Sequence, residues 1–190
     1  MESSTVIPHV YHTADGWFDF SEFYRQIAEW IPDGGRWVEV GVYAGKSFSF
    51  AVVECLNRGK KIDFVAVDMF PCEWIYIGNK PPVRQMFDKT METLAGHYRV
   101  EAGASVDVAR RFENGSVDFV FIDAAHDYES VIDDVTAWLP KVRPGGIIAG
   151  HDYEPDYPGL MRAVGEIFGN RVELIPYDGD EKKFCWKVQL

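Results

Sequence analysis

The sequence contains no hydrophobic run long enough to cross a bilayer. A membrane-spanning helix needs roughly 20 consecutive apolar residues, and no segment of the 190-residue chain approaches that length. The opening stretch, MESSTVIPHVYHTADG, also lacks a basic head followed by an apolar segment, so we expect no secretory leader. These absences predict a protein that neither enters a membrane nor is exported.

Cysteine is scarce, and basic residues are outnumbered by acidic ones. Cys55, Cys72 and Cys185 are far apart and form no CxxC pair, which predicts reduced thiols in a cytoplasmic protein rather than a disulfide framework or a zinc site. Lysine and arginine total 19 against 30 acidic residues, for a net charge of −11. A surface of that sign repels nucleic-acid phosphates and anionic lipids, so neither is an expected partner.

The chain does have enough apolar material for one sizeable core. Hydrophobic residues make up 47% of it, and 190 residues fit a single domain spanning 1–190. Residues 1–33 are predicted to be an N-terminal helical extension, because apolar residues recur at helical spacing within 17–31. Asp19 and Glu22 have the spacing of a helix-capping pair. A second copy of the chain could pack against the aromatic face of this helix, so a homo-oligomer is an open alternative.

From residue 36 onward, strand-like and helix-like segments alternate. Strands are expected at 36–42, 63–70, 97–103, 116–123 and 145–152, with helices at 45–59, 83–96, 105–115, 128–142 and 159–169. Such alternation predicts a parallel sheet with helices on both faces. The last segment, RVELIPYDGDEKKFCWKVQL, is predicted to be two strands with a tight turn, which must be antiparallel. The predicted fold class is therefore α/β, a mostly parallel sheet with an antiparallel C-terminal hairpin.

The first predicted strand ends in VEVGVYAGKS, a glycine-rich turn before a helix. Ligands of open parallel sheets bind beyond the carboxyl ends of the strands. A phosphate-binding P-loop has four residues between its glycines, whereas three separate Gly41 from Gly45, and a dinucleotide fingerprint would have glycine in place of Tyr43. The third interpretation is the E-x-G-x-x-x-G loop of S-adenosylmethionine (SAM) methyltransferases, which Glu39, Gly41 and Gly45 fit.

Two further strand ends carry candidate cofactor contacts. Asp68 ends the second predicted strand, where a carboxylate can accept hydrogen bonds from both ribose hydroxyls. A helix cap or a loop carboxylate is the competing interpretation of Asp68. The segment Gly103-Ala104-Ser105 follows the third strand and is predicted to line an adenine, with a helix cap as the competing interpretation.

Four segments in this order, VEVGVYAGKS, FVAVDMF, SVDFVFIDAAHDYESVIDD and VRPGGIIAGHDY, resemble class I SAM-dependent methyltransferases over about residues 34–153. The chain is similar to the small-molecule O-methyltransferase branch that includes macrocin O-methyltransferase. This resemblance implies a Rossmann-like, seven-stranded sheet and SAM as cofactor. The predicted cofactor-binding residues are Glu39, Gly41, Tyr43, Gly45, Ser47, Asp68, Ser105 and Asp123.

The tetrapeptide HDYE occurs twice, at 126–129 and 151–154, each time after an apolar run. Ends of adjacent strands lie roughly 4.8 Å apart, so Asp123, His126, His151 and Asp152 would cluster if the fourth and fifth strands pair. In related metal-dependent O-methyltransferases, two aspartates at these strand ends bind a divalent ion. The resemblance gives that role to Asp123 and Asp152, with Mg²⁺ as the ion. The chain departs from that pattern at Tyr153, where an asparagine is usual, and at His126, where a lysine base is usual.

The predicted catalytic residues are His126, Asp123 and Asp152. An imidazole with a pKa near 6.5 suits proton removal near neutral pH, so His126 is the predicted base. The two aspartates are expected to anchor a metal or orient the acceptor, and His151 is expected either behind these residues as a supporting contact or at the rim. The neighbouring residues are predicted to pack the helix start (Tyr128) or to form a solvated face (Glu129, Asp133 and Asp134).

The segment 70–84 contains Trp74, Ile75, Tyr76 and Ile77, and it is predicted to be a lid or an acceptor loop, with plain core packing as the alternative. The leading functional hypothesis is SAM-dependent methylation of a hydroxyl on a small molecule, such as a sugar or a phenol. A P-loop nucleotide hydrolase or kinase, favoured by the GKS tripeptide, and a SAM-binding module without transferase activity are the alternatives.

Overall fold

Seven strands form one sheet in the computed structural model, which describes residues 6–70 and 80–190. The strands are β1 (Arg36–Val40), β2 (Asp63–Asp68), β3 (Tyr98–Ala102), β4 (Val117–Ile122), β5 (Val142–Gly150), β6 (Glu173–Tyr177) and β7 (Asp180–Gln189). They lie in the order β3-β2-β1-β4-β5-β7-β6. Strands β1 to β5 pair in parallel, and β7 is antiparallel to both β5 and β6. The predicted α/β sheet with an antiparallel C-terminal hairpin is confirmed.

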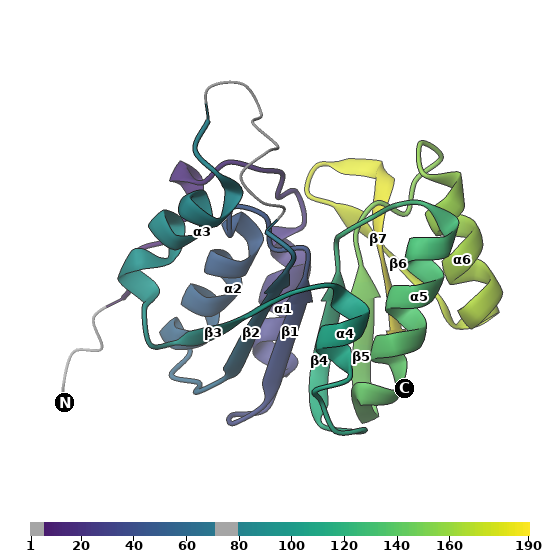
Figure 1. Cartoon of the computed structure of the whole chain (residues 1–190), viewed down its shortest axis with the longest axis horizontal. Coiled ribbons are helices and arrows are strands. Elements are labelled where there is room, and N and C mark those ends of the chain that lie inside the picture. Colours follow the sequence, from purple (N-terminus) through teal and green to yellow (C-terminus); the bar gives the residue numbers. More distant parts are fainter. Residues whose placement is uncertain (1–5, 71–79) are drawn as a thin grey trace.

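Helices cover both faces of this sheet (Figure 1). The α-helices are α1 (Ser21–Trp30), α2 (Lys46–Asn57), α3 (Val83–Met91), α4 (Ser105–Ala109), α5 (Tyr128–Trp138) and α6 (Pro158–Phe168). The first three pack on the face that carries Trp37, Phe119 and Phe121, and the last three pack on the face that carries Val120 and Ile122. The central strands are buried on both faces, so their sequences are continuously apolar. No helix of the described residues is long and apolar enough to span a membrane.

The first helix begins later than its sequence pattern predicts. It starts at Ser21 rather than near residue 17, and the expected capping pair of Asp19 and Glu22 does not form. The cap comes instead from Asp178, on the turn between β6 and β7, whose carboxylate accepts hydrogen bonds from the backbone N–H groups of Ser21 (2.6 Å) and Glu22 (3.3 Å). Residues 14–20 are consequently not helical, and they lead to the carboxyl edge of the sheet.

The helix predicted at 128–142 ends at Trp138. A 3₁₀ turn with a proline follows at Leu139–Lys141, and Val142 already belongs to β5. Proline lacks the N–H that a continuing α-helix would need, so the helix stops before it. Strand β5 is therefore longer than expected and begins three residues earlier.

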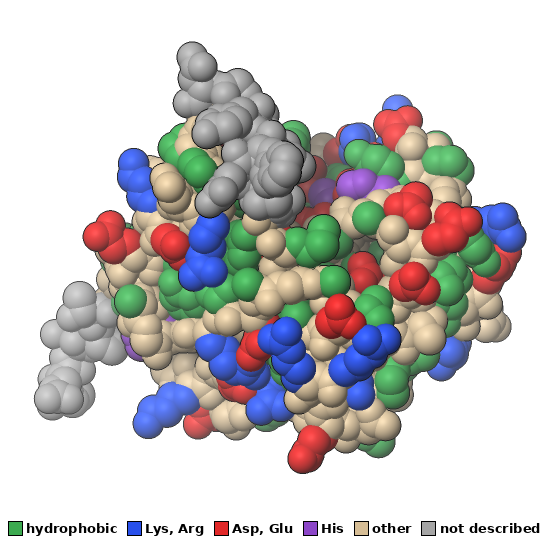
Figure 2. Space-filling model, viewed as in Figure 1, with side chains coloured by type: hydrophobic (Ala, Val, Ile, Leu, Met, Phe, Trp, Pro, Cys, Tyr) green, Lys and Arg blue, Asp and Glu red, His purple; other side chains and the backbone are tan. Residues whose placement is uncertain are grey.

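The chain order reverses beside β1. From β1 the chain proceeds outward through β2 to β3, and it then returns to place β4 on the other side of β1. The connections after β1 and β4 consequently run in opposite directions, which opens a crevice at the carboxyl ends of these two strands. In the space-filling view, histidine side chains lie in a hollow near the top of the molecule with acidic side chains beside them (Figure 2).

Candidate functional site

The crevice consists of two adjoining cavities. The first, here the Asp68 cavity, has a volume of about 550 Å³ and lies over the ends of β2 and β3. The second, here the His151 cavity, has a volume of about 450 Å³ and lies over the ends of β4 and β5. Both cavities are lined by Gly41, Tyr43, Asp123 and Ala124. The two cavities therefore adjoin at the loop that follows β1.

That loop has an unusual backbone. The φ angles of Gly41, Tyr43 and Gly45 are +89°, +46° and +81°, in the left-handed region that glycine adopts without strain. A Cβ atom on Gly41 would lie 1.9 Å from the carbonyl oxygen of Asp123, so the backbones after β1 and β4 touch there. The lysine of the GKS tripeptide, Lys46, donates to the carbonyl of Gly16 at 3.0 Å. Its ammonium is thus engaged by the protein backbone.

Glu39, in β1, stabilises the loop that follows this strand from the interior of the protein. Its side chain is completely buried in β1, where one carboxyl oxygen accepts from Tyr24 Oη (2.8 Å) and the other from Ser47 Oγ (2.5 Å). Burial raises the pKa of Glu39 to about 8, although both hydrogen bonds act to lower it. Ser47 lines the His151 cavity, so Glu39 is connected to that cavity through the Ser47 hydroxyl. Direct contact of Glu39 with a cofactor stays a prediction.

Asp68 also fastens the loop. Its two carboxylate oxygens accept from the backbone N–H groups of Tyr43 (2.9 Å) and Phe70 (2.6 Å). Burial raises its pKa, and the same two hydrogen bonds oppose that increase. The carboxylate lines the Asp68 cavity, so its structural role and the predicted ribose contact are compatible.

The far end of the Asp68 cavity is formed by Gly103, Ala104 and Ser105. The Ser105 hydroxyl accepts from Trp138 Nε1 at 2.9 Å and is hydrogen-bonded to Asp134. The expectation that Asp134 belongs to a solvated face is wrong: it is buried, and burial raises its pKa. Glu129 and Asp133 are exposed, as predicted.

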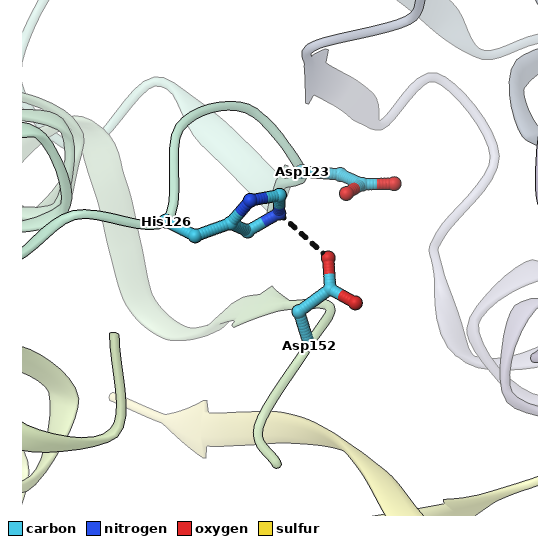
Figure 3. A group of neighbouring side chains, drawn as sticks. All are labelled: Asp123, His126 and Asp152. Atoms are coloured by element: carbon cyan, nitrogen blue, oxygen red, sulfur yellow. Dashed lines mark ion pairs between the residues drawn. The ribbon is translucent and has the colours of Figure 1, made fainter. Parts of the chain in front are cut away.

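Asp123, His126 and Asp152 converge in the His151 cavity (Figure 3). Asp123 follows β4, His126 lies in the loop before α5, and Asp152 follows β5. His126 Nε2 lies 2.7 Å from Asp152 Oδ2. That pair lacks the angles of a hydrogen bond, and the buried Nε2 atom has no hydrogen-bond partner among the described residues. One atom from each of the three side chains lies within 4.8 Å of the others.

This donor set fits a divalent cation. Ligands at neighbouring positions of an octahedral ion, each about 2.1 Å from it, lie about 3 Å apart. The carboxylates of Asp123 and Asp152 are hard oxygen donors, and the unpartnered Nε2 of His126 adds a nitrogen. Carboxylates suit Mg²⁺ or Mn²⁺, and imidazole extends the range to the later transition metals. Asp152 also has a φ of +58°, which an aspartate tolerates better than most residues.

His151 lies deeper than the rim, which was one of the two positions predicted for it. Its ring is buried, between Phe20 (4.7 Å between centroids) and Tyr177 (4.6 Å). Its Nε2 is hydrogen-bonded to Asp19 at 3.0 Å, and its Nδ1 lies 3.1 Å from Asp152 Oδ2 and 3.7 Å from Asp123 Oδ1. The histidine thus joins the segment before α1 to the ends of β4 and β5.

Burial and the neighbouring charges together set the pKa values in this group. Burial alone would lower the pKa of His151, but contacts with Asp152 and Asp19 and the charge of Asp123 raise it to about 10. Burial and the charge of Asp152 raise the pKa of Asp123 to about 6, against the opposing effect of His151. The two histidines hold the pKa of Asp152 well below its usual range despite burial, and the contact with Asp152 raises the pKa of His126.

The two HDYE copies contribute different residues to the cluster at the ends of β4 and β5. In the first, His126 enters the cluster while Asp127 caps α5 by accepting from Ser130 N–H at 3.0 Å. In the second, both His151 and Asp152 enter the cluster. Tyr128 packs at the helix start, as predicted, and donates to Glu166 at 2.5 Å.

Sequence reasoning missed Asp19, Tyr24 and Tyr177, which contact His151 or Glu39 from distant parts of the chain. Their spacing to those partners carries no signal in a single sequence. Trp17 was also missed: its side chain is 81% exposed at the mouth of the His151 cavity. The predicted lid or acceptor loop at 70–84, including Trp74 to Ile77, lies outside the described residues except at its ends. One of those ends, Val83, lines the Asp68 cavity.

Known proteins resemble this fold and part of this sequence. A family model described as a methyltransferase domain matches residues 38–153. The structure of the O-methyltransferase NovP has a TM-score of 0.67 at 21% identity, covering 89% of this chain and 78% of that one. CalS11, a TDP-rhamnose 3'-O-methyltransferase in calicheamicin biosynthesis, has a TM-score of 0.62 at 17% identity, covering 89% of this chain and 76% of that one.

A SAM-dependent methyltransferase from Aquifex aeolicus has a TM-score of 0.62 at 16% identity and covers 95% of each chain. At such identities, likeness to a solved structure establishes the fold. No curated protein matches the sequence.

Proposed function

This chain belongs to the methyltransferase-domain family, and on that premise we propose that it transfers the methyl group of SAM to a hydroxyl of a small molecule, with a divalent cation held by Asp123 and Asp152. The chain is a SAM-dependent methyltransferase. The observation that carries the proposal for the acceptor is the convergence of Asp123, His126 and Asp152 at one end of the crevice. The similarity to NovP and CalS11, both described as O-methyltransferases, supports a hydroxyl acceptor.

The nucleoside of SAM would occupy the Asp68 cavity. Each oxygen of Asp68 already accepts one backbone N–H group, and a carboxylate has about four lone-pair sites. Two sites therefore remain for the ribose hydroxyls. The adenine would lie against Gly103–Ser105, and the sulfonium would reach the His151 cavity past Gly41 and Ala124, which line both cavities.

The acceptor would occupy the His151 cavity. His126 Nε2 would take the hydroxyl proton as the acceptor oxygen bonds to the methyl carbon and the carbon–sulfur bond breaks, leaving neutral S-adenosylhomocysteine. This transfer requires the oxygen to lie in line with the sulfonium, so the cavity walls contribute orientation. Asp123 and Asp152 would hold the cation, which when bound would lower the pKa of the acceptor hydroxyl, and His126 Nε2 would stay free to accept the proton. In that state Asp123 and Asp152 would also fix the acceptor beside the methyl group.

Calorimetry with S-adenosylhomocysteine and with ATP tests the cofactor. We expect the first to bind and the second not to bind, because the loop has three residues between its glycines and Lys46 is engaged by Gly16. ATP binding without S-adenosylhomocysteine binding would reject the proposal. Asp68→Asn should weaken S-adenosylhomocysteine binding by about 10- to 100-fold, the loss expected for a hydrogen bond to a charged group. The exposed Glu129→Gln serves as the control and should bind normally.

Turnover tests the transfer step. A panel containing catechol and methyl α-L-rhamnoside would be incubated with SAM and Mg²⁺, with Mn²⁺, or with a chelator, and methylated product measured by mass. His126→Ala should lower kcat by about 100-fold or more, as removal of a general base usually does, whereas His97→Ala, on the exposed surface, should not. An unchanged rate for His126→Ala would remove that residue from the mechanism. If the chelator does not diminish product formation, the cation has no role in the transfer.

A further inference from the structure

Asp19 belongs to the site although it lies outside the matched family region of residues 38–153. Its Oδ1 atom is 3.0 Å from His151 Nε2, and this pair has the geometry of a hydrogen bond. The contacts of His151 Nδ1 with Asp152 and Asp123 are ion-pair distances. Because a carboxylate accepts and does not donate, the ring presents Nε2–H to Asp19. With Nε2 bound to Asp19, the ring nitrogen that faces the two other aspartates is Nδ1.

The position of Asp19 is fixed from the opposite side by the turn between β6 and β7. The backbone N–H of Asp178 donates to the Asp19 carbonyl at 2.6 Å, and the Asp178 carboxylate caps the helix that begins at Ser21. The ring of His151 is in turn confined between Phe20 and Tyr177. Neither partner of the Asp19–His151 hydrogen bond can shift without breaking one of these contacts.

The remaining nitrogen, Nδ1, lies at ligand spacing from the carboxylates. It is 3.1 Å from Asp152 Oδ2 and 3.7 Å from Asp123 Oδ1, against the roughly 3 Å between neighbouring ligands of an octahedral ion. Histidines that bind metals usually donate their other N–H to a carboxylate or a carbonyl, which fixes the ring and its tautomer. The Asp19–His151 pair has this arrangement.

We infer that Asp19 is a positioning residue: by holding His151 Nε2 it directs His151 Nδ1 toward the divalent cation, so that His151 becomes a further ligand once Nδ1 releases its proton to solvent on cation binding. This inference rests on the proposed function, which places that cation at Asp123 and Asp152. It assigns part of the centre to the segment before α1.

Manganese binding to the purified full-length protein tests the inference without any acceptor. Mn²⁺ would be titrated into the wild type, Asp19→Ala, Asp19→Asn and Glu22→Gln by calorimetry. Asp19→Ala should weaken Mn²⁺ binding by about 10- to 100-fold, the usual effect of losing the partner of a ligating histidine. Asp19→Asn retains an oxygen that accepts from Nε2–H and should bind more tightly than Asp19→Ala. Glu22→Gln removes a nearby exposed charge and should bind like the wild type.

Electron spin-echo spectroscopy of the Mn²⁺ complex provides a second readout, which a merely structural role would not change. The nitrogen coupling assigned to His151 through His151→Ala should weaken in Asp19→Ala. The affinity for S-adenosylhomocysteine should stay unchanged in His151→Ala and in Asp19→Ala, which shows that each variant is folded. Unchanged or tighter Mn²⁺ binding by Asp19→Ala overturns the inference and leaves the proposed function standing. A wild type that binds no Mn²⁺ overturns both the inference and the proposed cation, whereas methyl transfer is judged by turnover.

Discussion

Gly41 is the residue on which the shape of the crevice depends most directly. Another residue could adopt the positive φ of Gly41 at a moderate cost in conformational free energy. Its Cβ atom, however, would lie 1.9 Å from the carbonyl oxygen of Asp123. The two backbones touch because Gly41 N–H bonds to β2 and Asp123 N–H bonds to β1, each at 2.8 Å. The close approach therefore follows from the strand register itself.

Gly41→Ala should consequently destabilise the protein far more than Gly59→Ala. Gly59 also has a positive φ, +71°, but a Cβ atom there would have no neighbour within 4 Å. Its replacement should cost about 1–2 kcal/mol, the strain of a left-handed residue. Gly41→Ala adds the collision with Asp123, so the free energy of unfolding in urea should fall by at least about 2 kcal/mol more. Equal losses in the two variants would contradict the proposed backbone contact.

Residue positions could be predicted from the sequence where they follow directly from strand ends. Asp123, His126 and Asp152 were expected together because the carboxyl ends of paired parallel strands share one edge. Asp134 could have been assigned correctly, since Val131, Asp134, Val135 and Trp138 have the spacing of one buried helical face. Asp19 could not: its contact with His151 spans 132 residues, and no local pattern reports a contact of that range.

The turn between β6 and β7 supports two other elements. Through Asp178 it supplies the cap of α1 and holds the carbonyl of Asp19. The sequence offered a nearer cap in Asp19 and Glu22, and that prediction was wrong because Asp19 bonds to His151 instead. A capping pattern describes what a local carboxylate could do, whereas the fold decides which carboxylate reaches the helix first.

Asp178→Ala should lower stability by about 1 kcal/mol, the usual cost of losing an N-cap. Because the lost acceptor serves Ser21 and Glu22, hydrogen exchange should accelerate at those two amides. Glu181→Ala changes an exposed carboxylate close to the same turn and should leave both measurements unchanged. Exchange that stays slow at Ser21 in Asp178→Ala would show that the cap does not hold the helix.

At the scale of the whole molecule, the alternation of strands and helices was sufficient to predict the sheet and both helical layers. It did not predict strand order, because periodicity reports which face of a strand is buried and not which strand lies beside it. The order matters for the site, since the crevice lies where β4 returns to the free side of β1. One buried carboxyl group beneath that crevice, Glu39, should influence the stability of the entire chain.

The pKa of Glu39 is raised to about 8 by burial, against about 4.3 in an unfolded chain. Between these values the folded protein keeps a proton that the unfolded chain releases, so Glu39 contributes stability below about pH 4.3 that is lost as the pH rises toward 8. The loss is at most about 1.4 kcal/mol per pH unit. Glu39→Gln cannot titrate, so the wild type should lose stability relative to this variant between pH 5 and pH 8 in urea unfolding. Parallel curves for the two proteins would mean that Glu39 is ionised in the fold.

The position of β7 affects how the protein folds during translation. Strand β7 is made after the other six, yet it lies inside the sheet, between β5 and β6. During translation, β6 must leave the ribosome without a partner and wait for β7 to enter the gap beside β5. The turn that holds Asp19 forms at that same moment. A nascent chain therefore cannot complete the site until β7 has emerged from the ribosome.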